Sequence, residues 1–122
     1  MRAERIAAIP VNILWRYREF KRDETPAPRI AFFNMYDVDE VEEYVEANGL
    51  EPLELSIIKS KALLTDGNHR IVAARRLGYE EVMVKVTVYM CDGRDTFYDH
   101  TLDRFKEIDD ELGAWLKNLF IR

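Results

Sequence analysis

A run of five residues, Asp66-Gly67-Asn68-His69-Arg70, has the composition of an anion-binding turn. An apolar segment precedes it and a helical pattern follows it, so a strand, a tight turn and a helix are predicted in that order. The first amides of a helix have no intrahelical partner, and the helix dipole makes that end attractive to anions. Gly67 lacks a Cβ atom, which allows backbone and ligand to approach closely. Arg70 adds a planar fork of donors suited to phosphate or carboxylate.

Two roles are open for Arg70. On the predicted helix it heads the face that packs on the sheet. That face continues through Ala73, Ala74 and Leu77. A charge on a buried face needs an anionic partner, because an unpaired buried charge is costly. The partner is either a ligand phosphate or a protein carboxylate, for which Asp66 and Glu19 are the candidates. His69, at the start of the same helix, either contacts phosphate or caps the turn.

A second polar segment, residues 15–20, combines basic, aromatic and acidic side chains near the N-terminus, among them the neighbours Arg18 and Glu19. Residues 1–29 and residues 59–85 each carry three more basic than acidic groups. The two cationic segments could therefore meet in space and form a local anion site. The alternative is that residues 15–20 form an aromatic-rich surface helix and that the charges lie on solvated faces.

The remaining sequence supplies the elements that must position these groups. Alternating apolar and polar residues predict strands, whereas apolar residues three and four positions apart predict helices. The strands are expected at residues 6–11, 53–58, 62–65 and 82–89, and the helices at residues 37–48, 69–77 and 101–120. Pro10 cannot donate to a sheet ladder, so the first strand is expected at an edge. This order predicts an α/β or α+β fold with one mixed sheet flanked by helices.

Two of the predicted helices carry apolar stripes. The stripe of residues 37–48 consists of Val38, Val41, Tyr44 and Val45. The stripe of residues 101–120 consists of Leu102, Phe105, Ile108, Leu112, Trp115, Leu116 and Leu119. An exposed apolar patch at Trp115, Leu119 and Phe120, near the end of the chain, would favour weak homodimerisation. The alternative is a helix that completes the core of a monomer.

Length and composition limit the class of protein. The chain has 122 residues, of which 48% are hydrophobic and 34% charged, as is typical of one globular domain over residues 1–122. No apolar run approaches the about 18 residues of a membrane span, and no signal-peptide pattern precedes the first strand. Cys91 is the only cysteine, so an intramolecular disulfide is excluded and a cytoplasmic location is expected. The net charge of −5 argues against binding duplex DNA by bulk electrostatics.

The turn and its surroundings resemble the ParB/sulfiredoxin superfamily. The resemblance rests on Asp66-Gly67-Asn68-His69-Arg70, then Ala73-Ala74 and Leu77-Gly78, then a valine-rich strand. In that superfamily a Gly-x-x-Arg turn between strand and helix binds nucleotide phosphates. The resemblance covers residues 6–90 as a ParB/sulfiredoxin-like core, and residues 91–122 form a C-terminal helical extension without a counterpart.

The resemblance implies roles for individual residues. Gly67, His69 and Arg70 fall on the phosphate-binding turn, with the Asn68 amide beside them, and Asp66 would orient Mg²⁺ or the turn itself. Kinase-like members use an N-terminal glutamate as a base. By that similarity Glu19 is the candidate catalytic base and Arg18 a second phosphate ligand. Sulfiredoxins carry their catalytic cysteine where this chain has Asn68, which excludes reduction of sulfinic acids.

Two functions follow as expectations. The first is binding of a nucleotide (ATP, ADP or CTP) or another phosphate ester, with or without Mg²⁺, by a phosphotransferase or nucleotide hydrolase. Phosphoryl transfer requires mainly positioning and charge neutralisation, which this set of residues offers. The second is a non-catalytic ParB-like module that binds a protein or nucleic acid partner, as an accessory protein of phage or plasmid type would.

Overall fold

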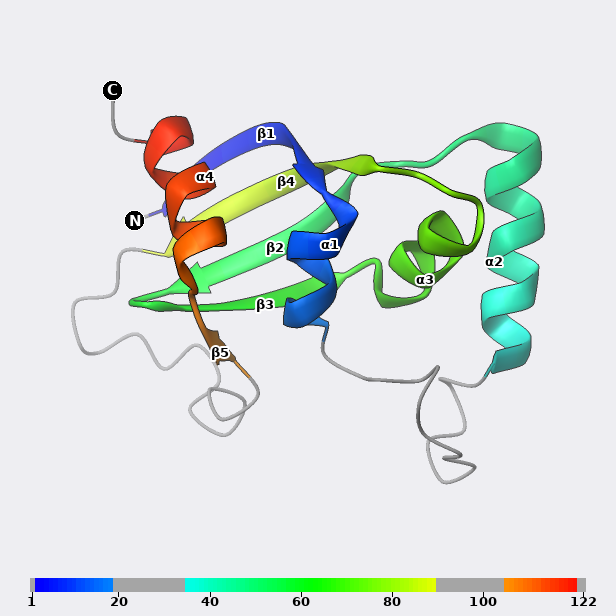
Figure 1. Ribbon diagram of the computed structural model, residues 1–122, viewed down its shortest axis with the longest axis horizontal. Helices are drawn as coiled ribbons and strands as arrows, with labels where there is room; N and C mark the ends of the chain where they lie inside the picture. The colour runs from blue at the N-terminus through cyan, green and yellow to red at the C-terminus, as the bar shows by residue number, and fades with distance from the viewer. Residues whose placement is uncertain (1, 19–34, 90–104, 121–122) are drawn as a thin grey trace.

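The computed structural model describes residues 2–18, 35–89 and 105–120 (Figure 1). Its elements, in chain order, are the strands β1 (Arg2–Pro10), β2 (Leu53–Ile58), β3 (Lys61–Asp66), β4 (Glu81–Tyr89) and β5 (Lys106–Glu107), and the helices α1 (Val11–Leu14), η1 (Trp15–Tyr17), α2 (Met35–Asn48), α3 (Asn68–Arg76) and α4 (Asp110–Phe120). Glu19 and Leu102 lie outside the described residues. No helix within the described residues is long and apolar enough to cross a membrane.

The strands form one mixed sheet in the order β1-β4-β2-β3-β5. β2 and β3 form an antiparallel hairpin, and β4 pairs parallel to β2 and antiparallel to β1. The connection from β2 to β4 contains β3 and α3, because adjacent parallel strands need a crossover. The predicted α+β class and the shared sheet of residues 53–58, 62–65 and 82–89 are thus confirmed. The strand predicted at residues 6–11 lies at the sheet edge, as Pro10 indicated, and begins earlier, at Arg2.

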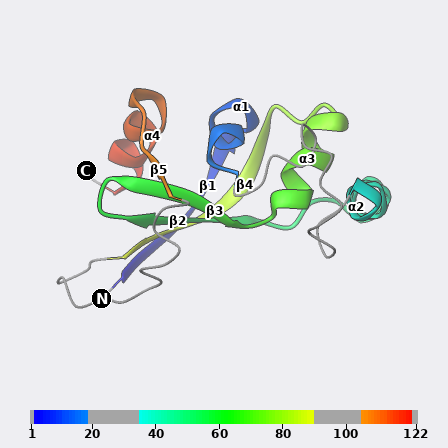
Figure 2. The same ribbon diagram turned by 90° about the horizontal axis from the view of Figure 1, so that it is seen from below.

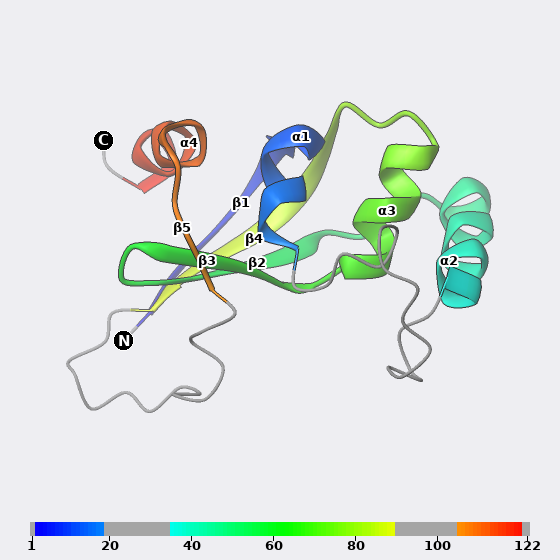
Figure 3. The same ribbon diagram turned by 60° about the horizontal axis from the view of Figure 1, so that its bottom comes forward.

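One face of the sheet carries the main core. Along β4 the alternation buries Val82, Val84 and Val86 and exposes Glu81 and Met83, which is the pattern of a strand covered on one side. Figures 2 and 3 show α1, α3 and α4 on the same side of the sheet, with α2 beside α3 at its end. The helices meet the strands in a single cluster of buried apolar side chains, which includes Ile9, Leu14, Leu55, Leu64, Ile71 and Leu112.

α2 differs from its predicted apolar stripe at one position. Val38 and Val45 are buried and Val41 is half-buried, but Tyr44 is 56% exposed. The helix packs along one side only, against α3, so a residue at the margin of the stripe stays in solvent. The helix ends as predicted before Gly49, whose φ of +87° is of the kind that terminates helices.

The predicted helix over residues 101–120 is wrong in its described part. α4 begins only at Asp110, and Lys106 and Glu107 before it form β5, which pairs with the start of β3. The Oδ1 atom of Asp109 accepts a hydrogen bond of 2.9 Å from the Leu112 N–H, which caps the helix at its true start.

Phe105 shows why the helical spacing was misleading. Instead of joining Leu112 in the main core, it packs in a separate cluster with Ile58 and Leu63. Residues Ile57 and Leu64, the chain neighbours of that pair, belong to the main core, so alternation places the Phe105 cluster on the opposite face of the sheet. Phe105, just before β5, and Leu112 of α4 are thus in helical register in the sequence but lie on opposite faces of the sheet.

Candidate functional site

The turn between β3 and α3 is tight at Gly67. Its φ of +103° and ψ of 20° lie in the left-handed region, which favours glycine. An ideal Cβ atom at this position would lie 2.5 Å from Cγ of Leu53, a fully buried side chain of β2. The backbone of Gly67 is therefore in close contact with the Leu53 side chain. This packing is sufficient reason for a glycine at position 67, without a ligand.

The first turn of α3 is the helix end at which the sequence predicts anion binding. No side chain caps the helix at Gly67, and no acidic residue stands in the first turn. The Ile71 N–H donates to the Gly67 carbonyl at 2.8 Å and closes that turn, so the amides before it point out of the helix end. Asn68 is buried and its Nδ2 donates to the Leu64 carbonyl at 2.9 Å, which ties the helix start to β3.

Arg70 connects the turn to the loop before β2. Its Nη2 lies 3.0 Å from Oδ2 of Asp66, and its Nη1 donates to the carbonyls of Glu51 and Pro52 at 3.1 and 2.9 Å. The Arg70 side chain is 20% exposed, whereas that of Asp66 is 60% exposed. Asp66, one of the two carboxylates that the sequence left open, pairs with Arg70, which therefore braces the turn; Glu19, the other, lies outside the described residues.

Arg18 is held in place by an aromatic ring. The residue is only 2% exposed, its Nε donates to the Trp15 carbonyl at 2.9 Å, and its guanidinium carbon lies 3.5 Å from the centroid of the Trp15 ring. The Arg75 guanidinium, from the last turn of α3, lies 4.1 Å from the centroid of that ring. Trp15 therefore gathers two cations by cation–π contact between η1 and α3.

The backbone brings Arg18 beside the strand that leads into the turn. Arg18 forms an isolated parallel bridge with Leu64 of β3, two residues before Asp66. Nζ of Lys106, next to β3 in the sheet, donates to the carbonyls of Arg16 and Arg18 at 2.9 Å each. Arg18, from one of the two polar segments, thus lies beside the strand that leads into the other.

An ion-pair network fastens η1 to the start of α4. Arg16 pairs with Asp109 and, at 2.8 Å, with Glu111, and the Asp109 N–H donates to the Tyr17 hydroxyl at 2.9 Å. The hydrogen bond from the Leu112 N–H, more than the neighbouring Arg16, lowers the pKa of Asp109. Burial raises the pKa of Tyr17. The network holds the residue before Arg18 against α4.

Sequence reasoning did not identify Trp15, Arg75 and Lys106 as neighbours of Arg18. Trp15 stood in the polar segment of residues 15–20, three residues before Arg18, and this spacing was the only available signal. Within residues 2–18, 35–89 and 105–120, no group of three or more His, Cys, Asp or Glu side chains gathers in a way that could hold a metal ion.

Comparison with known proteins gives a likeness in fold. A scan against protein-family models and a search of curated proteins each find no match. Among solved structures, sulfiredoxin from Arabidopsis thaliana is similar over 67% of this chain and 83% of its own, with 20% identity and a TM-score of 0.47. A Pnob8-like ParB-N domain is similar over 73% of this chain and 32% of its own, with 13% identity and a TM-score of 0.48. Both similarities concern the arrangement of the backbone alone.

Proposed function

We propose that the protein binds a nucleotide or another phosphate ester at the turn of residues 66–70, with Arg18 at its side. The observation that carries the proposal is the placement of Arg18, nearly fully buried, against Leu64 of the strand that enters the turn. An arginine is seldom buried without a structural or ligand-binding reason, because its charge is costly to desolvate. Leu64 lies two residues before Asp66, so Arg18 is near the start of α3, and the start of a helix attracts anions.

The surrounding charges support the same ligand. Arg18, Arg75 and Lys106 come together between η1, β3 and α3, although the whole chain carries a net charge of −5. No acidic side chain stands in the first turn of α3. A phosphate group at the start of α3 would meet backbone amides there, with Arg18 and Lys106 beside the strand that enters the turn, whereas Arg75 lies in the last turn of the helix.

Arg70 would serve this ligand by exchanging one partner. The carbonyls of Glu51 and Pro52 hold its Nη1, and the mostly exposed Asp66 carboxylate occupies its Nη2. A phosphate oxygen can replace that carboxylate on Nη2 while the two carbonyls keep the guanidinium oriented. Asp66, once released, is the carboxylate proposed to orient Mg²⁺, and Glu19, which follows Arg18 in the sequence, is the proposed base for phosphoryl transfer.

A non-catalytic binding module is the second candidate, and the contacts of Arg70 favour it. Three protein oxygens already satisfy this guanidinium, which is the arrangement of a structural brace. In such a module the turn would stabilise the fold, and a protein or nucleic acid partner would bind elsewhere. The two candidates differ in whether Arg70 contributes to binding of phosphate-bearing small molecules.

A thermal-shift panel of ATP, ADP, CTP and GTP, each with and without Mg²⁺, tests the first candidate. At least one nucleotide should raise the unfolding temperature, and Arg70→Ala should weaken its binding about ten- to a hundredfold through loss of a charge-assisted pair. Arg76→Ala is the matched control, because Arg76 lies on the same helix but pairs with Asp39 and Glu42 of α2.

Two outcomes would decide against the turn as a binding site. No shift with any nucleotide would contradict the proposal, and an unchanged affinity in Arg70→Ala would leave Arg70 as a brace and favour the module. Without Mg²⁺, Asp66→Asn should retain or strengthen binding, because it removes the competitor for Nη2. If a nucleotide binds and turns over, Glu19→Gln should abolish product formation while its affinity stays within about twofold, as expected for a base.

A further inference from the structure

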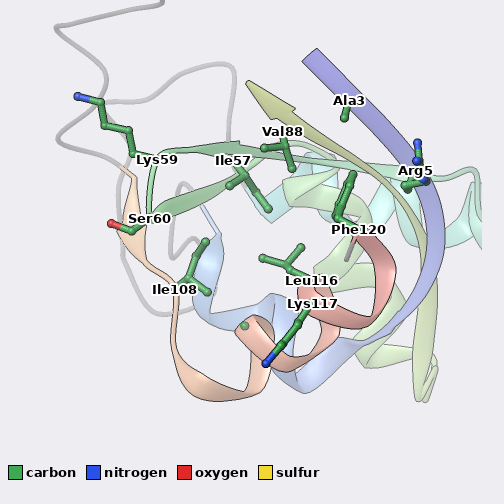
Figure 4. Close-up of a pocket in the computed structure, with 11 residues that line it drawn as sticks. Ala3, Arg5, Ile57, Lys59, Ser60, Val88, Ile108, Leu116, Lys117 and Phe120 are labelled. Carbon is green, nitrogen blue, oxygen red and sulfur yellow. The ribbon is translucent and has the colours of Figure 1, made fainter. Parts of the chain in front are cut away.

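A groove of about 720 Å³ lies between α4 and the sheet, at the far end of the molecule from the turn of residues 66–70 (Figures 1 and 4). Its volume is within the range of small-molecule sites, which is roughly 300–1,000 Å³. Figure 4 shows its apolar side chains converging from several elements. They are Ile57 of β2, Val88 of β4, Ile108 before α4, and Leu116 and Phe120 of α4.

The groove adjoins the part of α4 that is only partly buried against the core. Leu112 is fully buried in the main core, whereas Leu116 and Phe120, one and two turns later, are half-buried. Gly113 lines the groove with no side chain at all. An ideal Cβ at Gly113 would have only Ile108 within 4 Å, at 3.8 Å, so unfilled space adjoins the helix there.

Three cations stand around the mouth of this apolar groove. Figure 4 shows Arg5 of β1, Lys59 of the β2–β3 turn and Lys117 of α4 on three different sides, with their charged ends directed outward. Among the described residues, no carboxylate forms an ion pair with any of them. Arg5 instead lies over the Phe120 ring, 5.6 Å from its centroid.

We propose that this groove binds an amphiphilic anion, an aliphatic chain of medium length that ends in a carboxylate. The apolar side chains would cover the aliphatic chain, since burial of each methylene is favourable. Arg5, Lys59 and Lys117 form a cationic rim that would attract the carboxylate. This local positive charge contrasts with the net charge of −5 of the whole protein. The same rim repels an amphiphilic cation. The site is independent of the proposed phosphate site, so either can fail without the other.

Titration calorimetry with dodecanoate, below its critical micelle concentration, tests the proposal on the full chain. We expect saturable binding of one dodecanoate per protein. Butanoate should bind more than a hundredfold more weakly, because it buries far fewer methylenes. Dodecyltrimethylammonium has the same chain and the opposite charge, and it should bind more than tenfold more weakly than dodecanoate.

Two pairs of variants locate the site. Gly113→Leu fills the groove and should weaken dodecanoate binding at least tenfold, whereas Gly113→Ala adds one methyl in ordinary contact and should change it less than threefold. Neutralising the rim by Arg5→Gln, Lys59→Gln and Lys117→Gln together should weaken binding about tenfold or more. Lys85→Gln is the control, because alternation along β4 puts Lys85 on the opposite sheet face, where it pairs with Glu54.

Several results would overturn the proposal. These are the absence of saturable binding, equal affinity for dodecanoate and dodecyltrimethylammonium, or unchanged binding in Gly113→Leu. Thermal unfolding of each variant shows whether it is folded. A variant that is not folded is replaced by Leu116→Met, which keeps the side-chain volume but alters the wall of the groove. This variant should change the affinity for dodecanoate severalfold. If sedimentation shows a dimer and this dimer does not bind dodecanoate, the groove is a contact between two copies of the chain. That result would refute a small-molecule site.

Discussion

α3 and α4 lie on the same face of one sheet but pack on it in opposite ways (Figure 3). α3 presents small residues, and Ala73 and Ala74 are completely buried. The chain at its start touches the core so closely that only glycine fits at position 67. α4 presents large residues, of which Leu112 alone is fully buried, and a groove lies between part of the helix and the strands.

This difference underlies the two different ligands that we propose for the two ends of the molecule. The small side chains of α3 let it pack closely against α2, so the polar turn at its start is the part left for a ligand. The large side chains of Leu116 and Phe120 in α4 are only partly buried against the core, which leaves apolar surface open. A phosphate ligand is therefore expected at the start of α3, and an aliphatic ligand beside α4.

The largest expected effect tests the close packing at the start of α3. Gly67→Ala should lower the free energy of unfolding by about 3–4 kcal/mol, from the left-handed backbone and the overlap with Leu53 together. Gly78→Ala is the matched control, since Gly78 has a φ of +84° and no atom within 4 Å of an ideal Cβ. It should cost only about 1–2 kcal/mol. Equal losses in urea unfolding would contradict tight packing at Gly67.

The anchoring of α4 is tested by its cap. Asp109→Ala should lower the free energy of unfolding by about 1–2 kcal/mol, because the Leu112 N–H loses its acceptor. The folded-state pKa of Asp109 is lowered, so its contribution is present above the unfolded-state pKa and is lost as the pH falls through the folded-state value. Unfolding curves of wild type and Asp109→Ala should therefore converge in acid. Asp110→Ala, with no such bond described, should change stability by less than half as much.

A smaller effect of opposite sign is expected where α4 leaves space. Gly113→Ala should raise the free energy of unfolding by about 0.5–1 kcal/mol, because alanine is the better helix former and its methyl makes only an ordinary contact with Ile108. Glycine-to-alanine changes in α4 and at the start of α3 would then have opposite signs in the same denaturation assay. A loss of stability in Gly113→Ala would show that the groove is closed in solution.

The smallest expected effect concerns self-association through α4. Trp115 is 36% exposed, with Phe120 half-buried in the same helix, and this apolar surface is expected to support a weak homodimer. Sedimentation at several concentrations should show association that Trp115→Ala weakens severalfold and that Asn118→Ala, at an exposed polar position, leaves unchanged. A monomer mass that persists at high micromolar concentration would refute it.

The sequence by itself determined the strands β1, β2, β3 and β4 and the turn, but not β5. The alternation of apolar and polar residues in residues 82–89 indicates a strand that is covered on one face, because side chains alternate between the two faces of a sheet. Pro10 indicates an edge strand, because proline has no N–H to donate to a neighbouring strand. The same holds for the left-handed turn at Gly67 and the start of α3, which are encoded within a few neighbouring residues.

Only the tertiary structure decided what happens between distant residues. Periodicity joined Phe105 and Leu112 into one helix, yet the pairing of β5 with β3 and the cap at Asp109 divide them between two faces of the sheet. The partner of Arg70, the neighbours of Arg18 and the groove beside α4 likewise depend on contacts across the chain. The spacing of apolar residues indicates which side chains are buried. Where each of them lies relative to the sheet depends on long-range packing, which a local sequence pattern cannot predict.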